Sequence, residues 1–189
     1  GLSPEEAAEG YALACQARPR GNLVLSTARS EEPAVLARRA TAIVQAVAPL
    51  GPDVLHLRMA LPDEAPLDFQ PGQYFWVELP NRGHDDDKGL RRHISVVTSP
   101  TERGVLGLCT RLRDTAFKQT LAELEVGTEV DVEQPKGDYV LPEDTGPHYV
   151  FIAGGIGITV FRSMLRYIAD TGEPYRVTLV YSNRDREST

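Results

Sequence analysis

The sequence predicts an antiparallel all-β barrel or sandwich, followed by the start of an α/β domain with parallel strands. Between residues 38 and 145, short runs rich in β-branched and aromatic residues alternate with Gly, Pro and Asp, which is typical of strands joined by tight turns. From residue 146 onward, two continuous apolar runs flank a glycine-rich turn and a helical pattern. Such an order predicts a β-α-β crossover with both strands parallel.

Length and composition set the first limits on function. At 189 residues, with 41% hydrophobic and 25% charged residues, the chain can bury one good core or two small ones. A net charge of -7 argues against a general nucleic-acid binder. No apolar run approaches the about 18 residues of a membrane-spanning helix, so we expect no membrane span. Cys15 and Cys109 lie far apart and form no disulfide framework, which favours a reducing compartment, the cytoplasm.

Residues 1–27 precede the barrel pattern, and residues 28–37 form a polar stretch that we interpret as a linker. The run Leu13-Ala14-Cys15-Gln16-Ala17-Arg18-Pro19 resembles the C-terminal end of a plant-type two-iron ferredoxin domain. In that resemblance Cys15 matches the fourth iron ligand, and the other three belong to an upstream loop that this chain lacks. We therefore expect Cys15 to be a small buried residue, and a 2Fe-2S cluster to bind only if the missing ferredoxin portion is present.

Six strands are predicted in the barrel region, each bounded by turn residues. In residues 54–60 the apolar side chains alternate to one face, as in a half-buried strand. Residues 114–124 are predicted to form a helix that Asp114 caps, with an apolar stripe that packs on the core. The acidic run at residues 85–87 lacks the spacing of a calcium loop and indicates a solvated loop. The predicted strands are residues 40–47, 54–60, 69–79, 92–98, 105–112 and 129–134.

The run from Arg91 to Pro100 places two arginines beside a β-branched strand. A charge there costs desolvation unless it is neutralised, and Arg binds phosphate bidentately. This favours a phosphorylated ligand. Taken by itself, the segment also fits an alternative in which the two arginines are exposed to solvent at the end of the strand and bind nothing. A second anion site is predicted at the start of the helix near Asp114, just after Gly107-Leu108-Cys109-Thr110, because free N–H groups and the helix dipole attract negative charge.

The β-α-β pattern begins with an apolar strand at residues 149–153 and a glycine-rich turn. A helical repeat follows until Gly172, and residues 175–182 form the second strand. Such a turn lets backbone N–H groups approach a pyrophosphate. The dinucleotide fingerprint is incomplete, since Gly155 and Gly157 match but Val160 occupies the third position, so a tight structural turn is the alternative.

Taken together, residues 38–189 resemble the ferredoxin-NADP reductase superfamily, in which an antiparallel Greek-key β-barrel binds flavin and an α/β parallel-sheet domain binds nicotinamide. Arg92-His93-Ile94-Ser95 matches the Arg-x-Tyr-Ser flavin motif, and Gly107-Leu108-Cys109-Thr110 matches Gly-x-Cys-Ser. Gly154-Gly155-Ile156-Gly157-Ile158-Thr159 matches the Gly-Gly-x-Gly-x-Thr turn. The resemblance implies a ferredoxin-like remnant at 1–27, a linker at 28–37, an FAD-binding barrel at 38–145 and a truncated NAD(P)-binding domain at 146–189.

The resemblance also implies a role for each matching residue. Arg92 would pair with the flavin phosphate, and Ser95, the candidate catalytic residue, would hydrogen-bond the flavin ring near N5. Gly107, Cys109 and Thr110 would meet the pyrophosphate. The implied cofactor-binding residues are Arg92, His93, Ile94, Ser95, Gly107, Cys109, Thr110, Gly154, Gly155, Gly157, Thr159, Ser182 and Arg184.

Two departures from the family pattern affect these expectations. Ile94 replaces an aromatic residue that stacks on the flavin, so flavin affinity or potential would differ. Val160 replaces a Pro in the first turn of the helix, where Pro is tolerated without being required. Ser182 and Arg184 follow the second strand with no acid directly at its end, which slightly favours NADPH over NADH.

These implications describe an FAD-dependent oxidoreductase that passes hydride from NAD(P)H to FAD, then single electrons to an iron-sulfur centre. The order of domains resembles the reductase component of a multicomponent oxygenase, with a ferredoxin or oxygenase component as electron acceptor. Two alternatives stay open: a stand-alone ferredoxin or flavodoxin reductase, and a non-catalytic flavin-binding fragment with a two-stranded nucleotide domain. We also expect residues 146–189 to be poorly ordered or to lean on the barrel, because an open parallel pair is hard to keep in solution.

Overall fold

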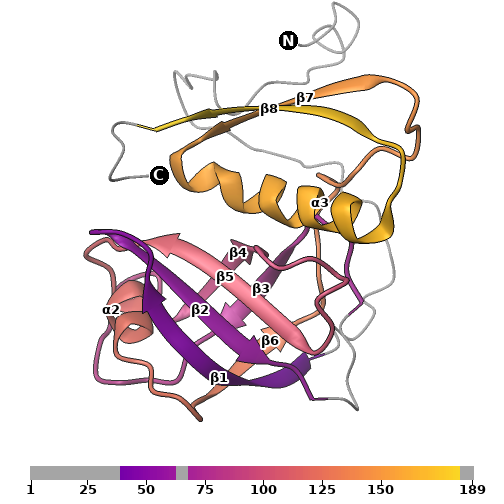
Figure 1. Cartoon of the computed structure of the whole chain (residues 1–189). Helices are drawn as coiled ribbons and strands as arrows, with labels where there is room; N and C mark the ends of the chain where they lie inside the picture. Colours follow the sequence, from indigo (N-terminus) through magenta and orange to yellow (C-terminus); the bar gives the residue numbers. More distant parts are fainter. Residues whose placement is uncertain (1–38, 63–67, 184–189) are drawn as a thin grey trace, which may run out of the picture. The chain divides into compact units, whose positions relative to one another are not determined.

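The computed structural model describes residues 39–62 and 68–183, which form a β-barrel and a β-α-β unit in the predicted order (Figure 1). Cys15, the linker at residues 28–37 and Arg184 lie outside the described residues. Within the described ranges, no helix is long and apolar enough to cross a membrane.

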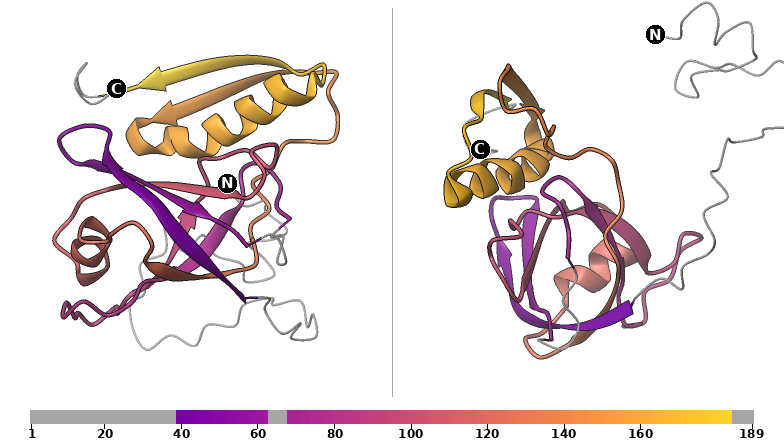
Figure 2. Two further views of the ribbon diagram at one scale, coloured as in Figure 1. Left: turned by 60° about the horizontal axis from the view of Figure 1, so that its bottom comes forward. Right: turned by 90° about the vertical axis from the view of Figure 1, so that its right-hand side faces the viewer.

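Six antiparallel strands form one sheet in the order β4-β3-β6-β1-β2-β5, which confirms the predicted antiparallel barrel. The sheet curls until its outer strands meet (Figure 2). There the Val97 N–H, just after β4, donates to the Gly107 carbonyl of β5 at 2.9 Å. The strands are β1 (Arg39–Pro49), β2 (Val54–Ala60), β3 (Tyr74–Glu78), β4 (Arg91–Ser95), β5 (Val105–Arg111) and β6 (Glu129–Glu133).

Alternation along the strands builds the barrel core. In β1, every second side chain from Ala40 to Val44 is buried. The helix α2 (Ala116–Ala122) lies across one end of the barrel (Figure 2), and Phe117 and Leu121 are each 1% exposed. The apolar stripe of this helix therefore packs on the core, as predicted from its spacing.

The β-α-β unit consists of β7 (His148–Gly154), the 3-10 helix η1 (Gly155–Gly157), α3 (Ile158–Thr171) and β8 (Arg176–Ser182). The two strands pair in parallel, which confirms the predicted crossover. Gly172 ends α3 at φ 71°, in the left-handed region that favours glycine.

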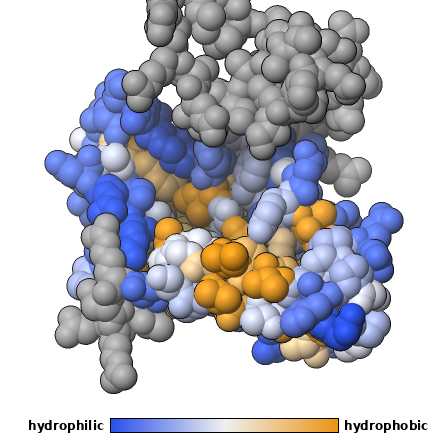
Figure 3. Space-filling model, turned by 90° about the horizontal axis from the view of Figure 1, so that it is seen from above, coloured by the Kyte–Doolittle hydropathy of each residue, from blue (hydrophilic) through white to orange (hydrophobic). Residues whose placement is uncertain are grey.

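The small parallel sheet is covered on one face within the described residues. Phe161 and Met164 of α3 pack against Phe151 and Ala153 of β7. On the opposite face Ile152 is 73% exposed, and hydrophobic residues gather where β7 and β8 lie in the view from above (Figure 3). The apolar runs predict strands covered on both faces, so this second face differs from the expectation. The exposed large hydrophobic residues of the unit are Val150, Ile152, Leu179 and Val180.

Three local expectations are corrected by the structure. The strand predicted at residues 69–79 begins only at Tyr74, because Gly72 adopts φ 107° and the Gln73 N–H donates to the Gln70 carbonyl in a turn. The strand predicted at residues 92–98 ends at Ser95. Asp114 does not cap α2: Thr115 is the residue before the first turn, and it makes no side-chain capping bond.

Candidate functional site

A groove of about 480 Å³ lies between the barrel and the start of α3. On the barrel side it is formed by the β1–β2 turn, β2, β5, and by Val97 and Thr98 after β4. The opposite side is the glycine-rich turn from Gly155 to Thr159, together with Tyr181 of β8. Concave sites between structural units are where small molecules usually bind, so this interdomain groove is the candidate site.

Gly107 allows the two outer barrel strands to approach closely beside the groove. A Cβ at this position would lie 2.8 Å from Thr98 Cγ2 and 3.0 Å from Val97 Cγ1. Its N–H donates to the buried Thr98 hydroxyl at 3.0 Å. Gly107 thus joins β5 to the segment after β4, and it lies inside β5, well before the start of α2 where a pyrophosphate role was expected.

The polar side chains of the interdomain groove include residues that the motifs did not indicate. Arg111 Nη1 lies 2.9 Å from Asp53 Oδ2 and joins β5 to the β1–β2 turn. Burial, followed by the charges of Arg162 and Arg58, lowers the pKa of His56, so this imidazole is neutral at pH 7. These contacts span long sequence separations, and only the Arg-x-Arg spacing at the end of β5 could have suggested them.

Cys109 lines the interdomain groove as a free thiol. Burial raises the pKa of this thiol to about 11. It is therefore protonated at neutral pH and is a poor nucleophile. Thr110, its neighbour in β5, points to the other side of the strand and does not line the groove.

The glycine-rich turn lines the groove with Gly155, Ile156, Ile158 and Thr159. Gly155 has φ 50°, and a Cβ there would lie 3.2 Å from Arg111 Nη2. Gly154 and Gly157 have open space at the Cβ position. Thr159 is buried, and its hydroxyl donates to the Ile156 carbonyl at 3.1 Å, so it stabilises the turn itself.

A second hollow of about 340 Å³ lies on the other side of this turn. Arg111 and Arg113 line it together with Gly154, Gly155 and Ser182. Two guanidinium groups that face a glycine-rich turn are suited to phosphate oxygens. The structure therefore brings the predicted Ser182 next to basic residues of the barrel.

Arg92 lies away from the interdomain groove, beside α2. Its guanidinium stacks over Phe117 at 5.7 Å, and Nη1 donates to the Lys88 carbonyl at 2.6 Å. Nη2 is buried and makes no hydrogen bond within the described part, but lies 3.6 Å from Asp86 Oδ1. An arginine with an unused buried donor has capacity for an incoming anion.

The Asp86 carboxylate lies beside the Arg92 guanidinium, at the position that a bound anion would take. Asp86 Oδ2 accepts the Ala116 N–H of α2 at 2.9 Å. This bond, followed by the Lys88 N–H and the charge of Arg92, lowers the pKa of Asp86. Asp85 and Asp87 are exposed, as expected of a solvated loop, but Asp86 turns inward and is an exception. A phosphate that reached Arg92 would therefore have to displace this carboxylate.

The remaining motif residues of β4 do not line the interdomain groove. His93 is exposed on the outer face, with its ring 5.2 Å from Trp76 and 5.5 Å from Tyr74. Ile94 packs on the barrel core, and Ser95 ends the strand just before the groove-lining Val97.

A protein-family model, the oxidoreductase FAD-binding domain, matches residues 41–140. The chain is 35% identical to the reductase subunit of an aromatic O-demethylase from Amycolatopsis sp., over 95% of this chain and 53% of that protein. It is 28% identical to the phenol hydroxylase P5 protein of Acinetobacter pittii, over 94% of this chain and 49% of that protein.

Among solved structures, the Amycolatopsis cytochrome P450 reductase is similar, with a TM-score of 0.67 and 34% identity over 100% of this chain and 56% of that one. The chain spans about half the length of these relatives. The motif order, the barrel topology and the matching family model agree with the resemblance to ferredoxin-NADP reductases. The chain therefore belongs to the oxidoreductase FAD-binding domain family.

Proposed function

We propose that this chain is the flavin-binding part of an NAD(P)H-dependent reductase. In this proposal hydride passes from NAD(P)H to FAD, and single electrons then pass to an iron-sulfur centre. The observation on which the proposal rests is the interdomain groove, which has β5 of the flavin-type barrel on one side and the turn from Gly155 to Thr159 on the other. Two ligands held on opposite sides would meet there, as hydride transfer requires.

FAD, when bound, would supply the chemistry of accepting a hydride and releasing electrons singly. Arg92 would hold a flavin phosphate in place of the Asp86 carboxylate. Ser95 would contact the ring at the end of β4, close to the start of the groove. The neutral His56 and the protonated Cys109 add no charge to the groove wall, whose charged residues on the barrel side are Asp53, Arg58, Glu102 and Arg111.

Gly154, Gly155 and Gly157 would bring backbone N–H groups to the nicotinamide dinucleotide, with Arg111 and Arg113 facing its phosphates. The preference for NADPH over NADH stays a prediction from Ser182 and Arg184. The names of the relatives, a phenol hydroxylase protein and the reductase subunit of an aromatic O-demethylase, support an oxygenase component as acceptor, and a ferredoxin as acceptor stays a prediction. A 2Fe-2S cluster at Cys15 is proposed only for a protein that includes the missing ferredoxin portion. The buried free thiol of Cys109 supports the cytoplasm as the compartment.

A non-catalytic flavin-binding fragment is the second candidate. The exposed face of the β7–β8 sheet favours it, because Ile152 is 73% exposed and Val150 is 56% exposed. In this candidate the barrel binds flavin and the β-α-β unit does not hold the nucleotide.

The visible absorption spectrum of the purified chain separates these candidates. We expect a flavin band after incubation with FAD, and we expect that band to bleach when NADPH or NADH is added without oxygen. A band that stays oxidised would favour the non-catalytic fragment. Arg92→Met should lose the band while Arg103→Met, a change on the β4–β5 turn, keeps it. A wild-type chain that binds no flavin would reject both candidates.

A further inference from the structure

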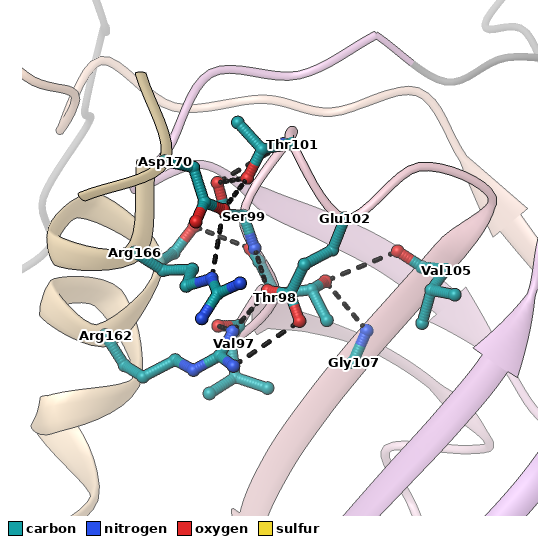
Figure 4. A network of polar contacts seen from close by, with 11 residues as sticks. Val97, Thr98, Ser99, Thr101, Glu102, Val105, Gly107, Arg162, Arg166 and Asp170 are labelled. Carbon is teal, nitrogen blue, oxygen red and sulfur yellow. Dashed lines mark hydrogen bonds and ion pairs between the residues drawn. The ribbon is translucent and has the colours of Figure 1, made fainter. Parts of the chain in front are cut away.

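Side chains on one face of α3 contact the segment that links β4 to β5 (Figure 4). Arg162 Nη1 donates to the Val97 carbonyl at 2.9 Å and pairs with the Glu102 carboxylate. Ser163 Oγ donates to the Thr98 carbonyl at 2.6 Å. About two turns further along the helix, Asp170 accepts a hydrogen bond from the Thr101 hydroxyl. The helix that follows the glycine-rich turn is therefore bound to the segment that follows the proposed flavin strand.

The Ser163 contact is buried and continues into the barrel. Ser163 is 0% exposed and Thr98 is 3% exposed. The Thr98 hydroxyl in turn accepts the Gly107 N–H at 3.0 Å. A buried hydroxyl needs its partner, because an unpaired one costs desolvation. One hydrogen-bonded path therefore joins α3, the end of β4 and the middle of β5.

The Arg162 contact is an ion pair with supporting bonds. Burial alone would raise the pKa of Glu102, but hydrogen bonds from Arg162 and from the Ser99 N–H lower it below its ordinary value. Arg162 uses the same Nη1 for Glu102 and for the Val97 carbonyl. Glu102 is thus charged at neutral pH and holds the guanidinium against the backbone of the segment.

The polar contacts matter for how α3 is held on the barrel, because the buried hydrophobic residues of the barrel and those of the β-α-β unit form separate clusters. The barrel forms one cluster of buried residues, and β7 with α3 forms another around Phe151, Phe161 and Met164. One ring contact also reaches α3 from outside the β-α-β unit, since Tyr139 lies edge to face with Phe161 at 6.1 Å. The contacts of Arg162 and Ser163 add the polar bonds that fix where α3 lies against the segment that links β4 to β5.

We propose that Arg162 and Ser163 are positioning residues that hold the turn from Gly154 to Thr159 at a fixed place opposite β4 and β5. This inference rests on the proposed function, since it assigns these side chains the task of setting the distance between nicotinamide and flavin. Hydride transfer requires reacting atoms about 3–3.5 Å apart, and a misplacement of about 1 Å costs on the order of 100-fold in rate. Neither residue needs to touch a cofactor.

The first test measures docking without flavin. Spin labels on Glu125→Cys in the barrel and Ala169→Cys in α3, in a Cys15→Ser background, report the distance between exposed positions of the two elements. We expect a narrow distance distribution that broadens in the Arg162→Met, Ser163→Ala double variant. Arg103→Met is the matched control, because it makes the same change at an exposed position of the same segment that takes no part in the contacts with α3 described above. A broad distribution in the labelled parent, or no change in the double variant, would overturn the proposal.

The second test measures flavin reduction in the FAD-loaded chain. The double variant should reduce flavin about 10- to 100-fold more slowly at saturating NADPH, with less than a twofold change in the apparent nucleotide Kd. Arg103→Met should match the parent. Equal rates in all three proteins, or a loss confined to Kd, would overturn the positioning role. A parent that binds FAD but is never reduced would reject the proposed function and this role with it, while the label distances would still report the docking contacts.

Discussion

Replacing Gly107 with Ala should destabilise the barrel although it adds a single methyl group. The new Cβ would lie 2.8 Å from Thr98 Cγ2, 3.0 Å from Val97 Cγ1 and 3.2 Å from His56 Nε2. Overpacking of this kind costs about 1–3 kcal/mol, and the lower entropy of the unfolded chain offsets about 0.4–1 kcal/mol. The net expectation is a loss of about 1–2 kcal/mol in the free energy of unfolding.

Urea unfolding followed by the fluorescence of Trp76 measures this loss, because Trp76 lies in β3 of the same barrel. Gly157→Ala is the matched control: Gly157 has φ -60° and open space at its Cβ. We expect that variant to be unchanged or more stable by up to about 1 kcal/mol. If Gly107→Ala is as stable as the parent protein or more stable, the packing role of this glycine is refuted. Ligand binding would then be the remaining explanation for its match to the flavin motif.

Other substitutions test the charged groups. Asp86→Asn keeps the hydrogen bond to α2 and removes the charge that competes at Arg92, so FAD titrations should show affinity about two- to fivefold higher. A lower affinity of Asp86→Asn for FAD would contradict the idea that Asp86 competes with the flavin phosphate for Arg92. Cys109 should resist alkylation by iodoacetamide at pH 7 and react faster as the pH approaches 11; rapid labelling at pH 7 would contradict its burial. The folded-state pKa of Glu102 lies below its unfolded value, so its pair with Arg162 stabilises the fold fully above pH 4.5 and is lost as the pH falls further. Acid unfolding of Glu102→Gln should accordingly depend less on pH below 4.5 than that of the parent.

The order of elements could be predicted because local patterns determine it. Alternation gave residues 54–60 as a strand with the bounds that the structure has. Gly172 marked the end of α3, and the glycine-rich turn marked the crossover. The strand at residues 69–79 was predicted too long, because the pattern did not show that the turn at Gly72 interrupts it.

The candidate site was only partly predictable, because its contacts join distant parts of the chain. Motif matching named Cys109 and Gly155, which line the groove, but not the Arg111–Asp53 pair on its barrel side. The anion site predicted at the helix start, after Gly107 through Thr110, stays a prediction, and those residues lie inside β5, within the strand predicted at residues 105–112. A match to a four-residue motif says nothing about how the strands pair, and the pairing decides where each side chain lies.

β4 connects the two separate parts of the proposed site. Arg92 lies near its start beside α2, whereas Val97, just beyond its end, lines the interdomain groove. Five residues of extended chain span about 16 Å, so the phosphate anchor and the groove are about that far apart along the strand. An FAD held by its phosphate at Arg92 would follow β4 past Ser95 and place its ring in the groove, opposite the glycine-rich turn. In this arrangement Asp86 can neutralise Arg92 in the flavin-free protein without closing the groove, because it occupies only the phosphate end of the path.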